Sequence, residues 1–101
     1  MKVDISSKGG QARLILNGRF DFGCRQAFRQ ACDQAMADGQ AQELVVDLAA
    51  VDYLDSSALG MLLLLRDRAM AANRSVSLAN GRGMVRDVLK VASFDRFFTL
   101  H

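Results

Sequence analysis

The stretch V-D-Y-L-D-S-S-A-L-G-M-L-L-L-L-R, from Val51 to Arg66, decides the fold. Its first residues are typical of a buried strand's exit loop, and the rest has the apolar spacing of a helix. Asp and Ser favour the N-cap position because their side-chain oxygens accept hydrogen bonds from the free N–H groups of the first turn. The sequence therefore predicts that the helix starts near Asp55 or Ser56.

Two serines occupy the predicted start of this helix. A hydroxyl at Ser56 or Ser57 would lie beside free backbone N–H groups and the positive end of the helix dipole, an environment that favours a phosphate. A phosphate added there could be held without disrupting the fold, unlike one at a helix C-terminus. The alternative is that Asp55, Ser56 and Ser57 serve only as a cap.

The apolar residues of the same helix point in two directions. At about 100° per residue, one side forms the stripe expected to face the core, made of Ala58, Met61, Leu62, Leu65 and Ala69. Ser56 and Gly60 lie on the other side, bordered by Leu63 and Leu64. A partner that approaches the backbone closely would explain Gly60, which costs about 1 kcal/mol relative to Ala inside a helix. The alternative is that another helix or loop of the chain covers Leu63 and Leu64.

Length and charge limit the number of domains and the classes of partner. The chain has 101 residues, half of them apolar, which is enough for one core and one domain. Its net charge of +2 is made of interspersed acids and bases, so charge does not imply a nucleic acid or membrane-surface partner. The basic edge formed by Arg82, Arg86 and Lys90 is interpreted as an ordinary solvated face.

Several classes of site are not expected. A charged strand-like segment follows Met1, and no run of eighteen apolar residues occurs, so we expect no membrane insertion and a cytoplasmic location. If Cys24 and Cys32 share a helix, their Cα atoms are about 12 Å apart, beyond the ~7 Å that a disulfide can bridge. We expect them to be free, half-buried packing residues. His101 is the single histidine, and no metal or other cofactor is expected.

The rest of the chain alternates strands and helices. The first two predicted strands, over 1–5 and 12–16, form an antiparallel hairpin through the turn-rich S-S-K-G-G of 6–10. A helix from about 23 to 37, a strand over 43–48, the helix that starts near Ser56 and a strand over 75–78 follow. The loop 80–83 opens a last helix, whose core stripe contains Val85, Val88 and Leu89 and extends to Ala92. Asn17-Gly18 is interpreted as the turn that ends the second strand. Phe94, Phe97 and Phe98 are expected to complete the fold at the end of the chain, where the sequence is also compatible with a short terminal strand. This order predicts an α/β fold, with a mixed sheet of four to five strands packed by three main helices.

Asp21 lies in the connection between the second strand and the first helix. Side chains in such connections are exposed and often functional. The alternative is that Asp21 is a cap or turn residue for that helix.

These residues resemble a known family. D-S-S-A-L-G-M-L, from Asp55 to Leu62, resembles the phosphorylation-site signature of the STAS domain in bacterial anti-sigma factor antagonists, whose pattern is close to D-S-[ST]-G-L-G. G-R-F-D, from Gly18 to Asp21, resembles the family's G-x-[LIF]-D element. Ala58 stands where the family usually has glycine. The resemblance covers nearly the whole chain, through V-V-D-L at 45–48 and V-R-D-V-L-K at 85–90, and implies one STAS domain over 1–101.

The resemblance implies a protein-binding switch. The unmodified domain would bind an anti-sigma factor, which in this family is often itself a serine kinase, and phosphorylation would abolish that binding. A protein serine phosphatase would restore the free form. The family's acceptor is the first serine of the motif, which is Ser56 here, with Ser57 as the second choice. The expected partner-binding residues are Asp21, Asp55, Ser56, Ser57, Gly60, Leu63 and Leu64.

The chain is expected to be a substrate and a ligand and not an enzyme. It has no base beside a nucleophile, and Gly81-Arg82-Gly83 is only a fragment of a glycine-rich phosphate loop. Stand-alone STAS domains also serve as cytoplasmic subunits of ABC-type lipid transporters. That variant typically lacks the intact D-S-[ST] motif, so the resemblance favours the switch. A nucleotide-binding or sensory role has no aromatic box or phosphate loop to support it.

Overall fold

The alternating residues at the start of the chain form an antiparallel hairpin. In the computed structural model, which describes residues 1–101, β1 (Lys2–Lys8) pairs with β2 (Gln11–Phe20), as predicted. Gly9 and Gly10 make the turn with φ angles of 60° and 80°. This left-handed region is open to glycine at little steric cost, so the two glycines determine where the hairpin reverses.

After the hairpin the chain alternates helices with parallel strands. The remaining elements are η1 (Phe22–Cys24), α1 (Arg25–Ala37), β3 (Glu43–Leu54), α2 (Ser56–Ala71), β4 (Ser75–Ala79), α3 (Gly83–Val91), η2 (Phe94–Arg96) and β5 (Thr99–Leu100). The sheet order is β1-β2-β3-β4-β5, and β2 to β5 are parallel. The predicted fold class, a mixed sheet with three main helices, is confirmed, and β5 is the short terminal strand.

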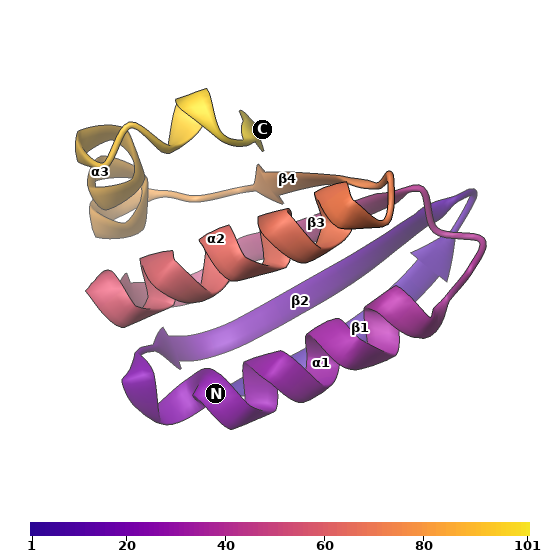
Figure 1. Ribbon diagram of the computed structural model, residues 1–101. Helices are drawn as coiled ribbons and strands as arrows, with labels where there is room; N and C mark the ends of the chain where they lie inside the picture. Colours follow the sequence, from indigo (N-terminus) through magenta and orange to yellow (C-terminus); the bar gives the residue numbers. More distant parts are fainter.

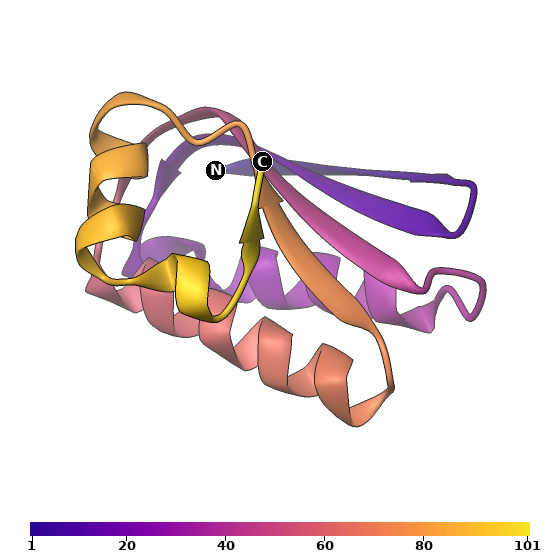
Figure 2. The same cartoon turned by 90° about the horizontal axis from the view of Figure 1, so that it is seen from above.

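The helices α1 and α2 lie side by side on one face of the sheet, and α3 packs at one end (Figures 1 and 2). The strand residues that face these helices are aligned across the sheet: Leu14 pairs with Val46, and Val46 with Leu78, all of them buried. Phe28 of α1 and Leu62 of α2 complete the core above them. The core is therefore a single layer between the sheet and its helices.

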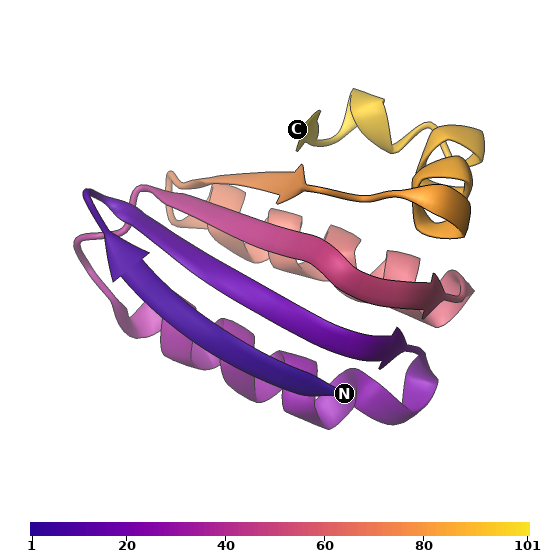
Figure 3. The same cartoon turned by 180° about the vertical axis from the view of Figure 1, so that it is seen from behind.

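The opposite face of the sheet has no helix over it (Figure 3). Asp47 organises a polar cluster on this face, and its Oδ2 accepts a hydrogen bond from Arg13 Nε at 3.0 Å. The Asp47 Oδ1 atom accepts from the Ala49 N–H at 3.0 Å and from Asn80 Nδ2 at 3.2 Å. Burial alone would raise the pKa of Asp47, but these hydrogen bonds and the charge of Arg13 outweigh it and lower that pKa. Asp47 therefore joins β2, β3 and the loop after β4.

Three predicted strand ends are wrong. The strand β1 does not end at Ile5 but continues to Lys8, so the turn takes up only Gly9 and Gly10. The strand β2 does not end at Asn17-Gly18 but continues to Phe20, and β3 continues through V-D-Y-L to Leu54. Gly18 has a φ of 110°, and the pairing of β2 with β3 shifts on both sides of it. The glycine therefore accommodates an irregularity within a long strand, where the sequence pattern indicated a turn.

Smaller differences concern the first helix and the cysteines. A 3₁₀ turn occupies Phe22–Cys24, so α1 begins at Arg25 and not near Gly23. Cys24 and Cys32 are free, as expected, but both are buried and not half-buried. In α2, Met61 is only half-buried, whereas the other four residues of the predicted stripe are in the core. Phe97 remains exposed beside the buried Phe94 and Phe98.

Candidate functional site

The carboxyl ends of β2 and β3 meet at one edge of the sheet. Their last residues, Phe20 and Leu54, are paired, and the Asp55 N–H donates a hydrogen bond to the Phe20 carbonyl oxygen at 3.3 Å. Asp21 and Asp55 each follow directly after one of these paired residues. The parallel pairing therefore brings together two of the predicted partner-binding residues that are far apart in the sequence.

Asp55 is the N-cap of α2. Its Oδ1 accepts a hydrogen bond from the Ala58 N–H at 2.9 Å, and α2 begins at Ser56, as predicted. The cap interpretation is thus correct for Asp55, and this single side chain supplies the cap. Ser56 is exposed and Ser57 is half-buried. The N–H groups of these two serines are among the first in the helix, which have no carbonyl one turn earlier to accept from them.

Asp21 also acts as a cap. Its Oδ1 accepts from the Gly23 N–H at 3.0 Å, which starts the 3₁₀ turn before α1. Its Oδ2 accepts from Arg19 Nε at 3.1 Å, so part of its charge is balanced within the chain. Asp21 remains partly exposed at the same edge as Asp55. The cap interpretation is correct, and Asp21 is still accessible at the surface while it caps the turn.

Two arginine–aromatic pairs flank Asp21 and were not predicted. The Arg19 guanidinium carbon lies 3.7 Å from the centroid of the Tyr53 ring, and that of Arg25 lies 4.1 Å from the centroid of Phe22. The Arg19 side chain is 62 % exposed and Phe22 is 58 % exposed. Arginine and aromatic residues are enriched at the energetic centres of protein interfaces. The edge thus offers anchors of the type that a protein partner uses.

An apolar surface extends from the serines to α3. Leu59, one turn after Ser56, is half-buried and lines a shallow groove of about 290 Å³ with Val88, Val91 and Ala92 of α3. Val91 is 87 % exposed, although it is a large apolar side chain. Val88, predicted to face the core, packs against it and is half-buried. Neither Leu59 nor Val91 was predicted at a site. The sequence held a signal for both in their helical spacing: Leu59 lies three residues after Ser56, and Val91 lies three residues after Val88.

The other predicted residues of α2 lie on different sides of it. Leu63, two turns after Ser56, is half-buried and packs against the core. Leu64 is 67 % exposed and lines a second groove, between α1 and α2. The structure therefore keeps Leu63 near the line of the serines, whereas Leu64 faces α1. A Cβ added at Gly60 would meet no heavy atom within 4 Å, so packing within the chain does not require this glycine.

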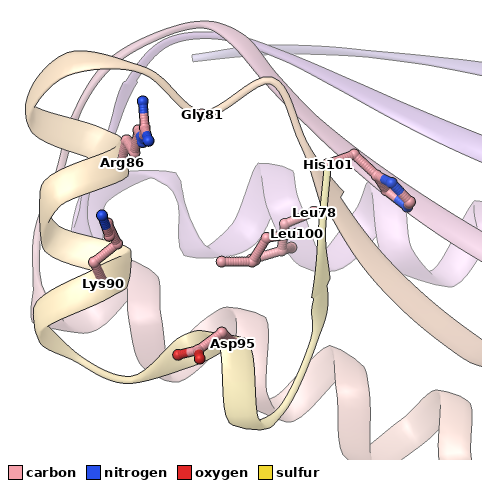
Figure 4. A pocket seen from close by; sticks show the side chains of 7 residues that line it. All are labelled: Leu78, Gly81, Arg86, Lys90, Asp95, Leu100 and His101. Carbon is pink, nitrogen blue, oxygen red and sulfur yellow. The ribbon is translucent and has the colours of Figure 1, made fainter.

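A third hollow, of about 630 Å³, lies between α3 and the end of the chain. Arg86 and Lys90 extend from α3 on one side and His101 lies on the other, around Leu78 and Leu100 (Figure 4). Two residues of the predicted basic edge thus line a hollow. The structure groups no three His, Cys, Asp or Glu residues so that they could hold a metal ion.

None of the helices combines the length and the apolar character that crossing a membrane would require.

Comparison with known proteins gives the family of the chain. A family model described as "Mlab, STAS domain" matches residues 3–100. A STAS-domain-containing protein of Pseudomonas aeruginosa strain UCBPP-PA14 is 44 % identical over 95 residues, which are 94 % of this chain and 92 % of that protein.

Two solved structures are similar in fold. An anti-sigma factor antagonist from Mycobacterium paratuberculosis superposes with a TM-score of 0.86 at 24 % identity, covering 99 % of this chain and 84 % of the other. The phosphorylated form of the Bacillus cell-fate determinant SpoIIAA gives a TM-score of 0.74 at 16 % identity, covering 99 % and 91 %. At these identities the similarity establishes the fold alone.

Proposed function

Because the chain belongs to the STAS-domain family, we propose that it is an anti-sigma factor antagonist controlled by phosphorylation of Ser56. The unmodified domain binds an anti-sigma factor and so frees the sigma factor. Phosphorylation of Ser56 ends that binding. The observation that carries the proposal is the division of roles at the start of α2: Asp55 supplies the cap, and the Ser56 hydroxyl stays exposed and free to be modified.

The proposed partner surface is centred on the meeting point of β2, β3 and α2. Asp21, Asp55, Ser56, Ser57 and Gly60 are exposed or half-buried there. The Arg19–Tyr53 pair borders the surface on the side of the strands, and the groove formed by Leu59 with α3 borders it on the other. Leu63 contributes from its half-buried position, and Leu64 lies at the margin that faces α1. A charged centre with apolar surroundings is suited to binding a protein.

Phosphate would act on such a surface through its charge. It adds about −1.5 to −2 charge at pH 7, next to the carboxylates of Asp21 and Asp55. If the interface excludes water and the partner offers no cation there, the penalty is several kcal/mol. At about 1.4 kcal/mol for each tenfold change, the affinity falls at least about a thousandfold. The fold survives, because free N–H groups and the helix dipole favour a negative group at a helix start.

Ser56 is preferred to Ser57 as the acceptor on exposure. A kinase must reach the hydroxyl, and Ser56 is exposed whereas Ser57 is half-buried. In this proposal the partner is an anti-sigma factor or a serine kinase, and a protein serine phosphatase removes the phosphate. The domain acts in the cytoplasm as substrate and ligand of these proteins and carries out no catalysis itself.

The test compares three variants in partner capture from lysate of the source cell. Ser56→Asp is expected to lose the anti-sigma factor, whereas Ser56→Ala and Ser75→Asp, at an exposed serine at the amino end of β4, retain it. All three are expected to unfold cooperatively near the wild-type temperature. Intact-mass measurement of the protein from two growth conditions, with mapping of the phosphate, identifies the acceptor. Wild-type capture by Ser56→Asp excludes the switch. Recovery of an ATPase and a permease would assign the domain to an ABC-type lipid transporter.

A further inference from the structure

The groove between α1 and α2 has an apolar floor and is larger than the two hollows beside α3. Its volume is about 690 Å³. Phe28, Cys32 and Leu65 form the floor and are almost fully buried, and the exposed Leu64 stands at its margin. Burial raises the pKa of Cys32 to about 12, so the floor carries no charge at neutral pH.

The α1 side of this groove carries two positive charges that folding does not explain. Arg25 and Arg29 both line it, and Arg25 is the first residue of α1. A positive charge in the first turn opposes the helix dipole. Like charges four residues apart on a helix also repel each other. None of the four ion pairs of the structure includes either arginine. Arg25 stacks on the exposed Phe22, 4.1 Å from the centroid of its ring, and donates a hydrogen bond to the Phe22 carbonyl oxygen at 3.2 Å.

Charged positions that break a local rule and have no opposite charge within the chain are often functional. Two unpaired arginines next to an apolar groove match a ligand with acidic groups beside an apolar face. A groove between two neighbouring helices fits a third helix, which would present apolar side chains every three or four residues. We propose that this groove is a docking site for an acidic amphipathic helix of a second protein.

A second copy of this chain does not bring the complementary charge. Each of the helices α1, α2 and α3 contains a single acidic residue, which is Asp33, Asp67 and Asp87, respectively. The groove is also lined by Arg68, which is held by Asp33 at 2.7 Å, and by Asp67, which lies 3.9 Å from Arg66. A helix of a second copy would therefore pair with at most one of Arg25 and Arg29, so we assign the acidic helix to a different protein.

The groove lies on another side of α2 than the phosphorylation site. At about 100° per residue, Leu64 and Arg68 are about 80° and 120° from Ser56, whereas Leu63 lies about 20° from it in the opposite direction. A helix in the groove would leave Ser56 accessible to a kinase. The inference goes beyond the proposed function and does not rest on it.

The first experiment uses a designed peptide and the full chain. The peptide is an amphipathic helix of about 18 residues, long enough to be partly helical, with leucines at i, i+3, i+4 and i+7 and glutamates on both flanks. A matched peptide has lysine in place of each glutamate. In ¹H–¹⁵N NMR titrations the acidic peptide is expected to shift the signals of Arg25, Arg29 and Leu64 and not that of Ser56. We expect the lysine peptide to bind at least about tenfold more weakly, since its charges repel the arginines. Equal binding by the two peptides, or shifts centred on Ser56, would overturn the proposal.

The second experiment uses charge reversal with a matched control. Arg25→Glu with Arg29→Glu is expected to weaken the acidic peptide about tenfold or more, as loss of close charge complementarity does. Arg86→Glu with Lys90→Glu makes the same change at the same spacing on α3 and should leave binding unchanged. The Arg25/Arg29 variant should melt at or above the wild-type temperature, because it relieves the unfavourable charges. A lower melting temperature would assign the arginines to the fold and overturn the inference.

Two further measurements distinguish a protein bound in this groove from binding at Ser56 and from binding to a lipid surface. Ser56→Asp should bind the acidic peptide as the wild type does, even if the proposed switch fails. Vesicles of phosphatidylcholine with phosphatidylglycerol test a lipid surface as the source of negative charge. Retention on these vesicles without peptide binding would replace the proposed protein partner by a membrane.

Discussion

The side chain of Asp55 and the backbone N–H of Ala58 form the 2.9 Å hydrogen bond that starts α2. Ala58 is fully buried, so the bond ties a surface carboxylate to the edge of the core. It also leaves the neighbouring serine hydroxyls out of the capping role. The stability of the helix start and the chemistry of Ser56 can therefore be changed separately.

Replacing Asp55 with alanine should destabilise the fold by about 1 kcal/mol, because the Ala58 N–H loses its acceptor. For a domain of this size the melting temperature should fall by about 4–8 °C. Thermal unfolding followed by circular dichroism measures the change. Asp55→Asn keeps an oxygen at the cap and serves as the control, and Ser56→Ala should change stability little. A larger loss in Ser56→Ala than in Asp55→Ala would contradict the assignment of the cap.

Arg19→Ala should weaken partner binding more than it weakens the fold. The side chain is 62 % exposed, and exposed ion pairs such as that with Asp21 add about 0–1 kcal/mol to stability. When a partner excludes water from it, an arginine stacked on tyrosine contributes about 2 kcal/mol or more. Isothermal titration calorimetry with the proposed anti-sigma factor measures the affinities of Arg19→Ala and of the control Arg82→Ala. Arg82 is an exposed arginine on the loop before α3. Equal affinities of the two variants would remove Arg19 from the partner surface.

Val91→Asp should prevent docking on α3 without unfolding the chain. Val91 is 87 % exposed, so a carboxylate there remains in water in the free protein. In a complex it would be buried beside Leu59 and Val88, where an unpaired charge is strongly unfavourable. Met70→Asp, at the far end of α2, makes a similar change on an exposed apolar residue. Pull-down and urea unfolding of both variants test this; a partner that binds Val91→Asp normally does not use the groove.

Asp47 should make stability fall in acid. Its folded-state pKa lies below the ordinary 3.8, so the unfolded chain takes up the proton first as the pH drops. The stabilisation is complete well above pH 3.8 and is lost as the pH falls from about that value through the lowered pKa. Urea unfolding between about pH 7 and about pH 2.5 should show a shallower acid decline in Asp47→Asn than in the wild type. Identical pH profiles would mean that the bonds to Arg13 and Asn80 do not matter in solution.

The residues that act locally were predictable from the sequence. Asp55 as a cap and Ser56 as the first residue of α2 follow from the preferences of one helix turn, and the hairpin follows from Gly9 and Gly10. The family resemblance, now supported over residues 3–100, implied the same order of strands and helices along the chain. These features depend on few neighbours in the chain, which is why a pattern of residue types was enough.

The features that depend on strand register could not be predicted. Asn17-Gly18 is a dipeptide typical of a turn. That Gly18 instead accommodates a shift in register becomes visible only when β2 is paired with β3. Arg19 meets Tyr53 for the same reason, since they are partners across that pairing. The exposure of Val91 depends on how α3 crosses the end of the sheet. Periodicity within one helix contains no information on that crossing.

The sheet order repeats the order of the chain, from β1 to β5. Each strand after β1 can therefore pair with the strand that was synthesised just before it. Such pairing of strands adjacent in sequence favours rapid folding during synthesis. Unpaired strand edges are then exposed only briefly to other nascent chains, which limits aggregation.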